Sequence, residues 1–175
     1  WVGFYGSGVG KYNGSTWSVY TPENSGLAGP EGLTIFQDSL GNMWFGTGDG
    51  VSKFDGDNWS TYTAANGLIA DPVYAIGEDT MGSMWFGGPY GVSKLDGSTW
   101  TTYTTADGLA SNYTLAIVPG DNGVMWTGGT GISKFDSPTW STYLCPDLLA
   151  GNWINSIVID TEGHKWFGTR TGLSE

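Results

Sequence analysis

The chain has 175 residues, enough for one ordinary domain, and six basic against seventeen acidic residues give a formal net charge of −11. An acidic surface repels phosphate backbones, and no apolar run is long enough to cross a bilayer, so neither nucleic acid nor a membrane span is expected. Thirty glycines and ten tryptophans favour an all-β protein with many tight turns and half-buried aromatic surfaces.

One stretch recurs along the whole chain. Residues 44–63 read WFGTGDGVSKFDGDNWSTYT, similar copies occupy 85–104 and 126–143, and weaker copies occupy 1–21 and 166–175. The leading tryptophans lie 43, 41, 41 and 40 positions apart, at Trp1, Trp44, Trp85, Trp126 and Trp166. A fixed period of this size is typical of a repeat architecture.

Each period divides into four short candidate strands. The first is the apolar run before the leading tryptophan, at 33–37, 73–77, 113–118 and 155–159. The second carries that tryptophan, as in 43–47, the third is of the Val-Ser-Lys-Phe type, as in 51–54, and the fourth is of the Trp-x-x-Tyr type, as in 59–63. These runs alternate or are rich in β-branched and aromatic residues, and none has the apolar spacing of a helix.

The turns between the strands are equally regular. An Asp-x-x-Gly pattern joins the first two strands at 38–41, 79–82 and 160–163, and an Asn-Gly or Asp-Gly pair precedes the fourth strand at 13–14, 55–56 and 96–97. Aspartate bonds backbone amides in a turn, and glycine accepts the positive φ that closes it. In the third copy Gly120 replaces the aspartate and Asp121 follows, so we expect a different turn there.

Four antiparallel strands in about 41 residues predict the blades of a β-propeller. We expect the leading tryptophans to pack between blades and the Trp-x-x-Tyr side chains, on outer strands, to be partly covered. We interpret residues 1–175 as a single domain, with units of about 1–32, 33–72, 73–112 and 113–153 and a partial unit at 154–175.

The strand count leaves three arrangements open. The pattern contains four first, third and fourth strands but five second strands. Residues 155–159 could close a ring of four beside 1–20, the chain could be an arc of a larger ring, or terminal strands could be completed by another copy. The surplus second strand favours the arc or the inter-chain arrangement.

The repeat Asp-x-x-Gly-x-x-Trp-Phe-Gly-Thr-x-x-Gly-Val-Ser-Lys-Phe resembles the two-component regulator propeller repeat, and the resemblance extends over essentially the whole chain. That family builds periplasmic sensor regions of bacterial hybrid histidine kinases and occurs in other exported proteins. The resemblance therefore implies an extracellular or periplasmic propeller with a sensing role.

The loops entering each first strand, together with those between second and third strands, vary most between copies and predict the ligand face. The entering loops are 22–32, 64–72, 105–112 and 145–153. The candidate ligand-binding residues on this face are Glu31, Asp49, Asp71, Tyr90, Asn112, Tyr113 and Trp153. Aromatic rings among carboxylates and amides favour a carbohydrate or peptide-like ligand, or another protein.

Residues suited to catalysis or metal binding are few. His164, the single histidine, falls in an Asp-x-x-Gly turn and is expected to be exposed. Virginiamycin-lyase-like enzymes have a similar aromatic propeller, and that resemblance implies histidine-based elimination, but one turn histidine is a poor basis for it. Cys145 cannot form an intrachain disulfide and is expected to be buried. We therefore predict a non-enzymatic protein without a cofactor or metal.

Four lysines occupy the same position in successive copies: Lys11, Lys53, Lys94 and Lys134. We expect each to lay its stem over an aromatic ring and to pair with an acid such as Asp55, Asp96 or Asp136. A ring of anion-binding ammonium groups is the alternative interpretation.

Two functions follow from these observations. The first is a non-enzymatic binding or sensing module, and the alternative is a structural subunit that assembles into rings or filaments through unpaired terminal strands.

Overall fold

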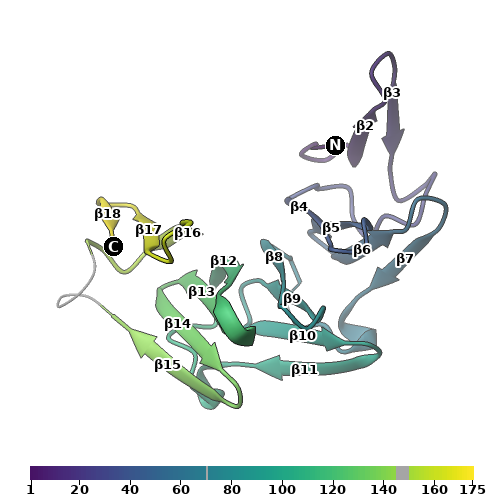
Figure 1. The fold of residues 1–175 in the computed structure, drawn as a ribbon. Coiled ribbons are helices and arrows are strands. Elements are labelled where there is room, and N and C mark those ends of the chain that lie inside the picture. The colour runs from purple at the N-terminus through teal and green to yellow at the C-terminus, as the bar shows by residue number, and fades with distance from the viewer. Residues whose placement is uncertain (70, 145–149) are drawn as a thin grey trace.

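A computed structural model describes residues 1–69, 71–144 and 150–175, and it contains five antiparallel sheets arranged in an arc (Figure 1). We call the sheets blades 1 to 5. Blade 1 contains β1 (Val2–Gly3), β2 (Val9–Tyr12) and β3 (Trp17–Tyr20). Blade 5 contains β16 (Ile154–Ile159), β17 (Lys165–Thr169) and β18 (Leu173–Ser174). Cys145 and the start of the loop 145–153 lie outside the described residues.

The three middle blades have four strands each. Blade 2 contains β4 (Thr34–Gln37), β5 (Met43–Thr47), β6 (Gly50–Phe54) and β7 (Trp59–Tyr62). Blade 3 contains β8 (Ala75–Glu78), β9 (Met84–Gly87), β10 (Val92–Asp96) and β11 (Thr99–Tyr103). Blade 4 contains β12 (Thr114–Pro119), β13 (Met125–Gly129), β14 (Gly131–Asp136) and β15 (Thr139–Tyr143). The helical segments described are the short 3-10 turns η1 (Ala64–Asn66), η2 (Thr105–Asp107) and η3 (Asp121–Gly123).

The arc is open. The first strands β4, β8, β12 and β16 lie on its inner side, and the two chain ends lie at its opposite ends (Figure 1). Strand β16 pairs with β17 and not with blade 1, so the structure excludes the closed ring of four. The strand count from the sequence was also incomplete. It missed β18, which is only two residues long and is the third strand of blade 5.

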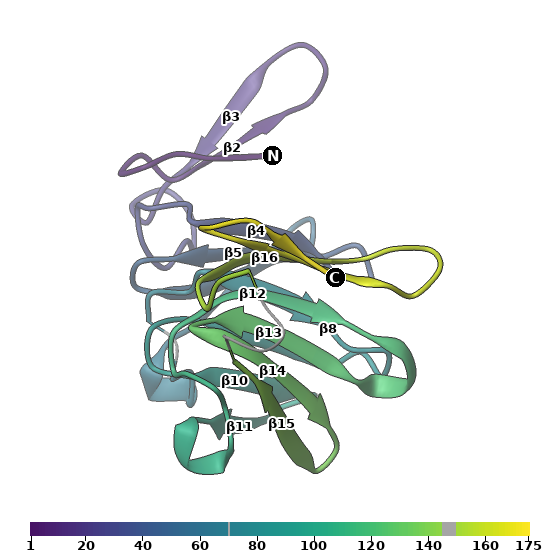
Figure 2. The ribbon, with the colours of Figure 1, turned by 90° about the vertical axis from the view of Figure 1, so that its left-hand side faces the viewer.

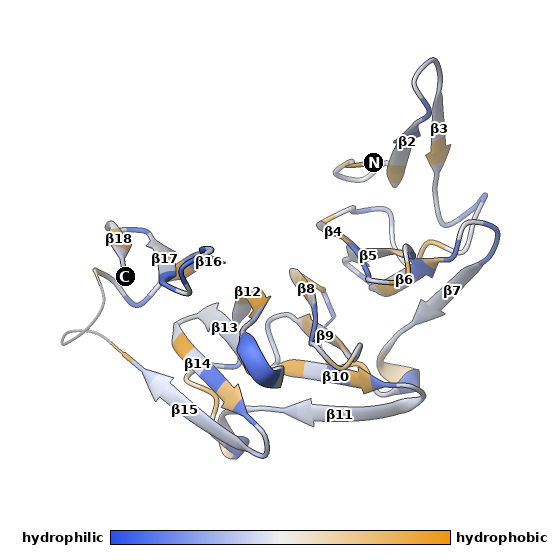
Figure 3. Cartoon of the chain, viewed as in Figure 1, coloured by the Kyte–Doolittle hydropathy of each residue, from blue (hydrophilic) through white to orange (hydrophobic). Residues whose placement is uncertain are grey.

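Aromatic cores seal neighbouring blades against one another. Trp44 and Val51 of blade 2 pack against Met84, Phe86 and Leu95 of blade 3. At the next interface Trp85 and Val92 pack against Met125 and Phe135 in the same way. Orange, hydrophobic segments lie on β8, β10, β12 and β14 in Figure 3, while the outer strands β11 and β15 are pale. The predicted role of the leading tryptophans is confirmed here, because Trp44 is 3% and Trp85 0% exposed. The outer tryptophans Trp59, Trp100 and Trp140 are half-buried, as expected.

The Asp-x-x-Gly turn binds the leading tryptophan of its own blade. In blade 3, one carboxylate oxygen of Asp79 accepts from Trp85 Nε1 (3.0 Å) and the other accepts from two backbone amides of the turn. Asp38 and Asp160 accept from Trp44 and Trp166 in the same way. We call this arrangement the carboxylate clamp. The predicted glycine role is confirmed, since Gly41, Gly82 and Gly163 have φ values of 83° to 88°.

Blade 4 lacks the clamp, as the sequence predicted. Gly120 stands at the aspartate position, and the turn becomes η3, with Asn122 at φ 55°. The hairpin itself is kept, because Gly120 N still donates to Val124 O, as Asp79 N donates to Ser83 O in blade 3.

Three of the four repeated lysines, Lys11, Lys53 and Lys94, lie over the leading tryptophan of their own blade. Lys94 lies directly opposite Trp85 in the β9–β10 register, and its Nζ stands 5.1 Å from the ring centroid. Lys94 forms its ion pair with the clamp residue Asp79 (3.2 Å) and not with Asp96. The lysine side chain crosses the indole of Trp85, so its ammonium group ends beside the Asp79 carboxylate that accepts from the indole N–H. The expected pairing is confirmed for Lys134 and Asp136 (3.2 Å).

Serines of the third strands hold the entering loops. Ser52, Ser93 and Ser133 are buried, and their hydroxyl oxygens accept from the backbone amides of Ala28, Ile69 and Ala110, respectively. Each loop is thereby attached to the blade that it enters, which positions the ligand face described next.

Candidate ligand-binding face

The antiparallel order of each blade brings the entering loops and the loops between second and third strands to the same end of the molecule. We call this end the loop face; the turns η1 and η2 project there, on the left-hand side of Figure 2. The carboxylate clamps lie at the opposite end, because they belong to the turns between first and second strands.

An aromatic row crosses the loop face from blade 3 to blade 5. The rings of Tyr74 and Tyr113 lie 5.7 Å apart between centroids, and those of Tyr113 and Trp153 lie 5.4 Å apart. The guanidinium of Arg170 stacks on Trp153, with Cζ 4.1 Å from the ring centroid. Burial raises the pKa of Tyr74, and the neighbouring Tyr113 and Tyr90 raise it further.

Three predicted acids belong to loops at the same end of the blades: Glu31 and Asp71 to the loops entering blades 2 and 3, and Asp49 to the loop between β5 and β6. The carboxylate of Asp49 lies against Gly29, where a Cβ would stand 2.8 Å from Oδ2. The carboxylate of Glu31 lies against Gly48, where a Cβ would stand 2.8 Å from Oε2. Burial raises the pKa of Asp71, and the charge of Asp49 adds to the rise. Oδ1 of Asp71 is buried without a hydrogen-bond partner in the described structure. This oxygen is enclosed by protein and is not exposed to solvent.

The predicted site residues differ in their surroundings. Tyr113 and Trp153 are in direct contact, Asp49 and Asp71 are electrostatic neighbours, and Tyr90 is 60% exposed. Asn112, in contrast, accepts from the backbone of Thr105 (2.7 Å) and holds its own loop.

Sequence reasoning missed two residues of the row. Tyr74 was read as the start of a core strand, but strand β8 begins only at Ala75, so this ring remains with the loop. Arg170 is the single arginine of the chain and follows the Trp-Phe-Gly-Thr motif directly, at a position taken by Gly48 in blade 2. An isolated charged residue at a variable repeat position was the available signal.

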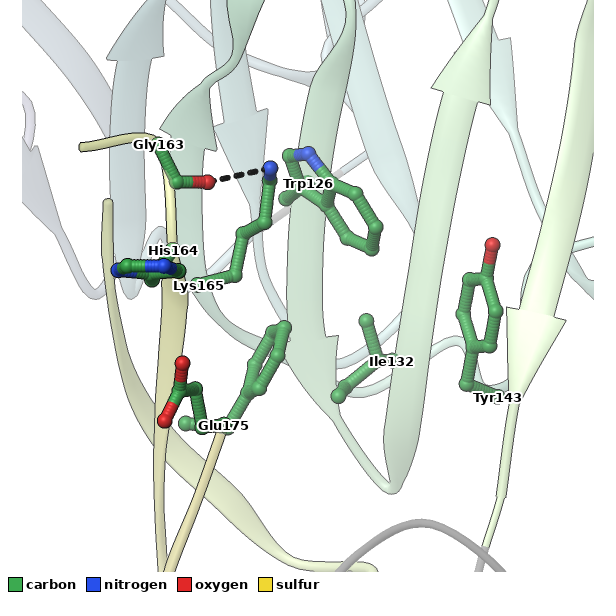
Figure 4. Close-up of a pocket in the computed structure, with 8 residues that line it drawn as sticks. Trp126, Ile132, Tyr143, Gly163, His164, Lys165 and Glu175 are labelled. Atoms are coloured by element: carbon green, nitrogen blue, oxygen red, sulfur yellow. Dashed lines mark hydrogen bonds between the residues drawn. The ribbon is translucent and has the colours of Figure 1, made fainter. Parts of the chain in front are cut away.

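A separate apolar groove of about 420 Å³ lies between blades 4 and 5 (Figure 4). Trp126, Ile132 and Tyr143 form its blade 4 side, and Phe167 lies on the blade 5 side. At the two preceding interfaces, third- and fourth-strand residues of the following blade fill the corresponding position. At the interface of blades 3 and 4, for example, Phe135 and Trp140 pack against Trp85. The groove is therefore an inter-blade contact region beside the three-stranded blade 5, distinct from the loop face.

His164 is exposed in its turn, as predicted. Its side chain is 48% exposed, and Nδ1 lies 3.2 Å from the clamp carboxylate of Asp160 and 3.9 Å from Glu162. Among the described residues, no group of three or more histidine, cysteine or acidic side chains is placed to hold a metal ion. In the same part of the chain, no helix has the length and apolar character needed to span a membrane.

The comparisons with known proteins identify the repeat. Residues 33–49 match the profile of the two-component regulator propeller family. The chain carries the two-component regulator propeller repeat. The predicted resemblance is thus confirmed, and no curated protein sequence matches the chain.

Solved structures establish the propeller fold. The extracellular domain assigned to the hybrid two-component system BT3049 from B. thetaiotaomicron is 24% identical, with a TM-score of 0.79 over 91% of this chain and 24% of that one. The corresponding domain of BT4673 from the same organism is 16% identical, with a TM-score of 0.80 over 97% of this chain and 24% of that one. This chain therefore spans about a quarter of each of those structures.

A virginiamycin B lyase from Staphylococcus aureus, solved with quinupristin, is also similar. It is 16% identical, with a TM-score of 0.69 over 93% of this chain and 59% of that one. Sensor domains and an enzyme thus share this architecture, so the likeness shows the fold, and function has to be argued from the side chains.

Proposed function

We propose that this propeller is a non-enzymatic, exported sensing module whose loop face binds a carbohydrate or peptide-like ligand. The observation that carries the proposal is the aromatic row Tyr74–Tyr113–Trp153, with Arg170 stacked on its last ring. Flat aromatic surfaces contact the apolar faces of sugar rings or peptide side chains, and the acids of the loop face accept hydrogen bonds from hydroxyl and amide groups. The family to which the repeat belongs and the sensor domains of similar fold support this assignment.

A binding screen tests the proposal. Cello-, malto- and xylo-oligosaccharides and a set of tripeptides are titrated against the protein by calorimetry. The variant Trp153→Ala should weaken binding by about tenfold or more, because the stacking of one flat ligand ring on an aromatic side chain contributes on the order of 1–3 kcal/mol. Trp17→Ala, which removes an exposed tryptophan on blade 1, is the matched control and should leave binding unchanged. Saturable binding that Trp153→Ala does not affect would contradict the assignment of the site.

Self-association is a second candidate function, and the two end faces of the arc favour it. Blade 1 exposes Val2, Tyr12 and Trp17 at 42%, 50% and 54%. By strand register these residues correspond to Phe45, Phe54 and Trp59 of blade 2, which pack against the preceding blade. At the other end Val158 and Leu173 are 58% and 63% exposed. The two end faces of neighbouring copies could therefore form a contact like those between blades.

Sedimentation velocity over a wide concentration range tests this second candidate. The wild-type chain should form dimers and larger oligomers as concentration rises. Trp17→Lys should remain monomeric, because burying an unpaired ammonium group in the contact costs free energy. Tyr90→Lys, which alters an exposed aromatic residue on the loop face, should associate like the wild type. A wild-type chain that stays monomeric at the highest concentration excludes self-association.

A further inference from the structure

The interface between blades 4 and 5 departs from the repeat at two positions. Blades 2, 3 and 5 hold the leading tryptophan with an aspartate, whereas blade 4 has Gly120. The first residue of the second strand is methionine in the middle blades and packs on the preceding blade, whereas blade 5 has Lys165. The carboxylate that accepts from the indole is thus absent, Asp121 follows one residue later, and one ammonium is added.

These departures leave three hydrogen-bond donors around one tryptophan. In the described structure Trp126 Nε1 has no acceptor, while its counterparts in blades 2, 3 and 5 all donate to the clamp. Lys134 Nζ pairs with the exposed Asp136, and Lys165 Nζ donates to Gly163 O (2.5 Å), beside the indole (Figure 4). An ammonium group carries three N–H donors, so both lysines retain donors for another partner.

A groove of about 380 Å³ gives access to these donors. Trp126 and Lys134 line it from blade 4 and Lys165 lines it from blade 5, while Asp121 and Asp136 also border it. The indole packs closely against Gly120, since a Cβ there would stand only 3.1 Å from Trp126 Nε1. The two exposed aspartates disfavour a multiply charged anion such as phosphate, so the groove suits a single carboxylate.

We propose that this groove binds the carboxylate group of a ligand in place of the aspartate that blade 4 lacks. Blade 3 shows the bonding pattern that the ligand would reproduce: Asp79 Oδ2 accepts from Trp85 Nε1 (3.0 Å) and from Lys94 Nζ (3.2 Å). Trp126 and Lys134 are the corresponding donors in blade 4, and Lys165 adds a third. This site lies at the clamp end of the blades, so it is independent of the loop face.

The indole N–H resonance of Trp126 in ¹H–¹⁵N spectra is the direct probe, assigned with Trp126→Phe. The ligands are N-acetylglycine, which resembles a peptide C-terminus, and D-galacturonate, a sugar acid, each paired with its neutral methyl ester. We expect the resonance to shift saturably with at least one acid and with neither ester. A response to only one acid supports the proposal and identifies the source of the carboxylate. A response to neither acid, or an equal response to the esters, overturns it.

Two variants test the donor set. Gly120→Asp restores an internal carboxylate at a residue whose φ of −102° any side chain adopts, and the indole has to shift by a few tenths of an ångström to admit its Cβ. This variant should weaken acid binding about tenfold or more. Lys165→Met restores the residue of the repeat and should have a similar effect. The controls are Ser98→Asp, which adds the same charge in an exposed turn of blade 3, and Lys53→Met, which removes a lysine from blade 2. Undiminished acid binding in both test variants would overturn the proposal.

Discussion

At the scale of single residues, the clamp aspartate joins a turn, a tryptophan and a lysine through one side chain. Asp79 is 6% exposed and accepts from two turn amides, from Trp85 and from Lys94. Burial alone would raise the pKa of Asp79, but these donors hold it below its ordinary value. The carboxylate is therefore better stabilised in the folded protein than in water.

Removing this charge should destabilise the protein. We expect Asp79→Asn to lower the free energy of unfolding by about 2–4 kcal/mol, because buried donors lose a charged acceptor. Urea denaturation followed by tryptophan fluorescence measures the change. Asp96→Asn, in an exposed turn of the same blade, is the control and should alter stability by less than about 0.5 kcal/mol. Equal midpoints for the two variants would show that the clamp is not stabilising.

The clamps also predict the pH dependence of stability. The pKa values of Asp38 and Asp79 are lowered despite burial, and the indole of Trp166 with the turn amides lowers that of Asp160 to about 2. A carboxylate with a lower pKa in the folded state stabilises fully above its unfolded pKa of about 3.9 and loses this contribution as the pH falls through the folded value. Asp71, whose pKa is raised, acts in the opposite direction.

Glu23 and Asp55 also have lowered pKa values, so five lowered carboxyl groups against one raised one predict net acid destabilisation. Thermal midpoints should vary little above about pH 5 and fall between about pH 4 and pH 2. Circular dichroism at pH 6, 4 and 3 measures the trend. Asp38→Asn should flatten the curve, and a midpoint that rises on acidification would contradict the assignment.

At the scale of elements, a serine of the third strand fixes the entering loop in blades 2, 3 and 4. Ser93 is fully buried, and its hydroxyl oxygen accepts from Ile69 N at 2.8 Å. Ser93→Ala should cost about 1 kcal/mol of stability and should speed hydrogen exchange at the Ile69 amide. Exchange measured by NMR tests this, with Ser98→Ala in an exposed turn as the control. Unchanged exchange at Ile69 would mean that the loop is held by other contacts.

At the scale of the whole molecule, stability should fall from the middle of the arc toward its ends. Blade 3 has an aromatic core on both sides, whereas blades 1 and 5 each have a neighbour on one side only. In a repeat protein the stability of a unit depends on its contacts with adjacent units. Hydrogen–deuterium exchange should therefore show the greatest protection in β9 and β10 and the least in β1 and β18. Uniform protection would indicate a single cooperative unit, or terminal blades covered by self-association.

The sequence alone determined the blades. Period, strand order, hairpin turns and the packing of the leading tryptophans were all predicted, because they depend on local turn chemistry and on contacts that recur at a fixed spacing. Even the altered turn at Gly120 could be seen as a departure from the repeat. For the same reason Tyr113 and Trp153 could both be assigned to the same end of the blades, but that their rings touch was not predicted.

Only the tertiary structure decided how the blades and their side chains meet. The open arc, the ion pair of Lys94 with Asp79 and the contact of Arg170 with Trp153 join residues from different strands or loops, and no local pattern specifies them. The placement of Gly120 and Lys165 on either side of Trp126 is of the same kind. Gly120 alters the turn of blade 4, and Lys165 alters the second strand of blade 5. The two changes lie near each other only because adjacent blades pack face to face.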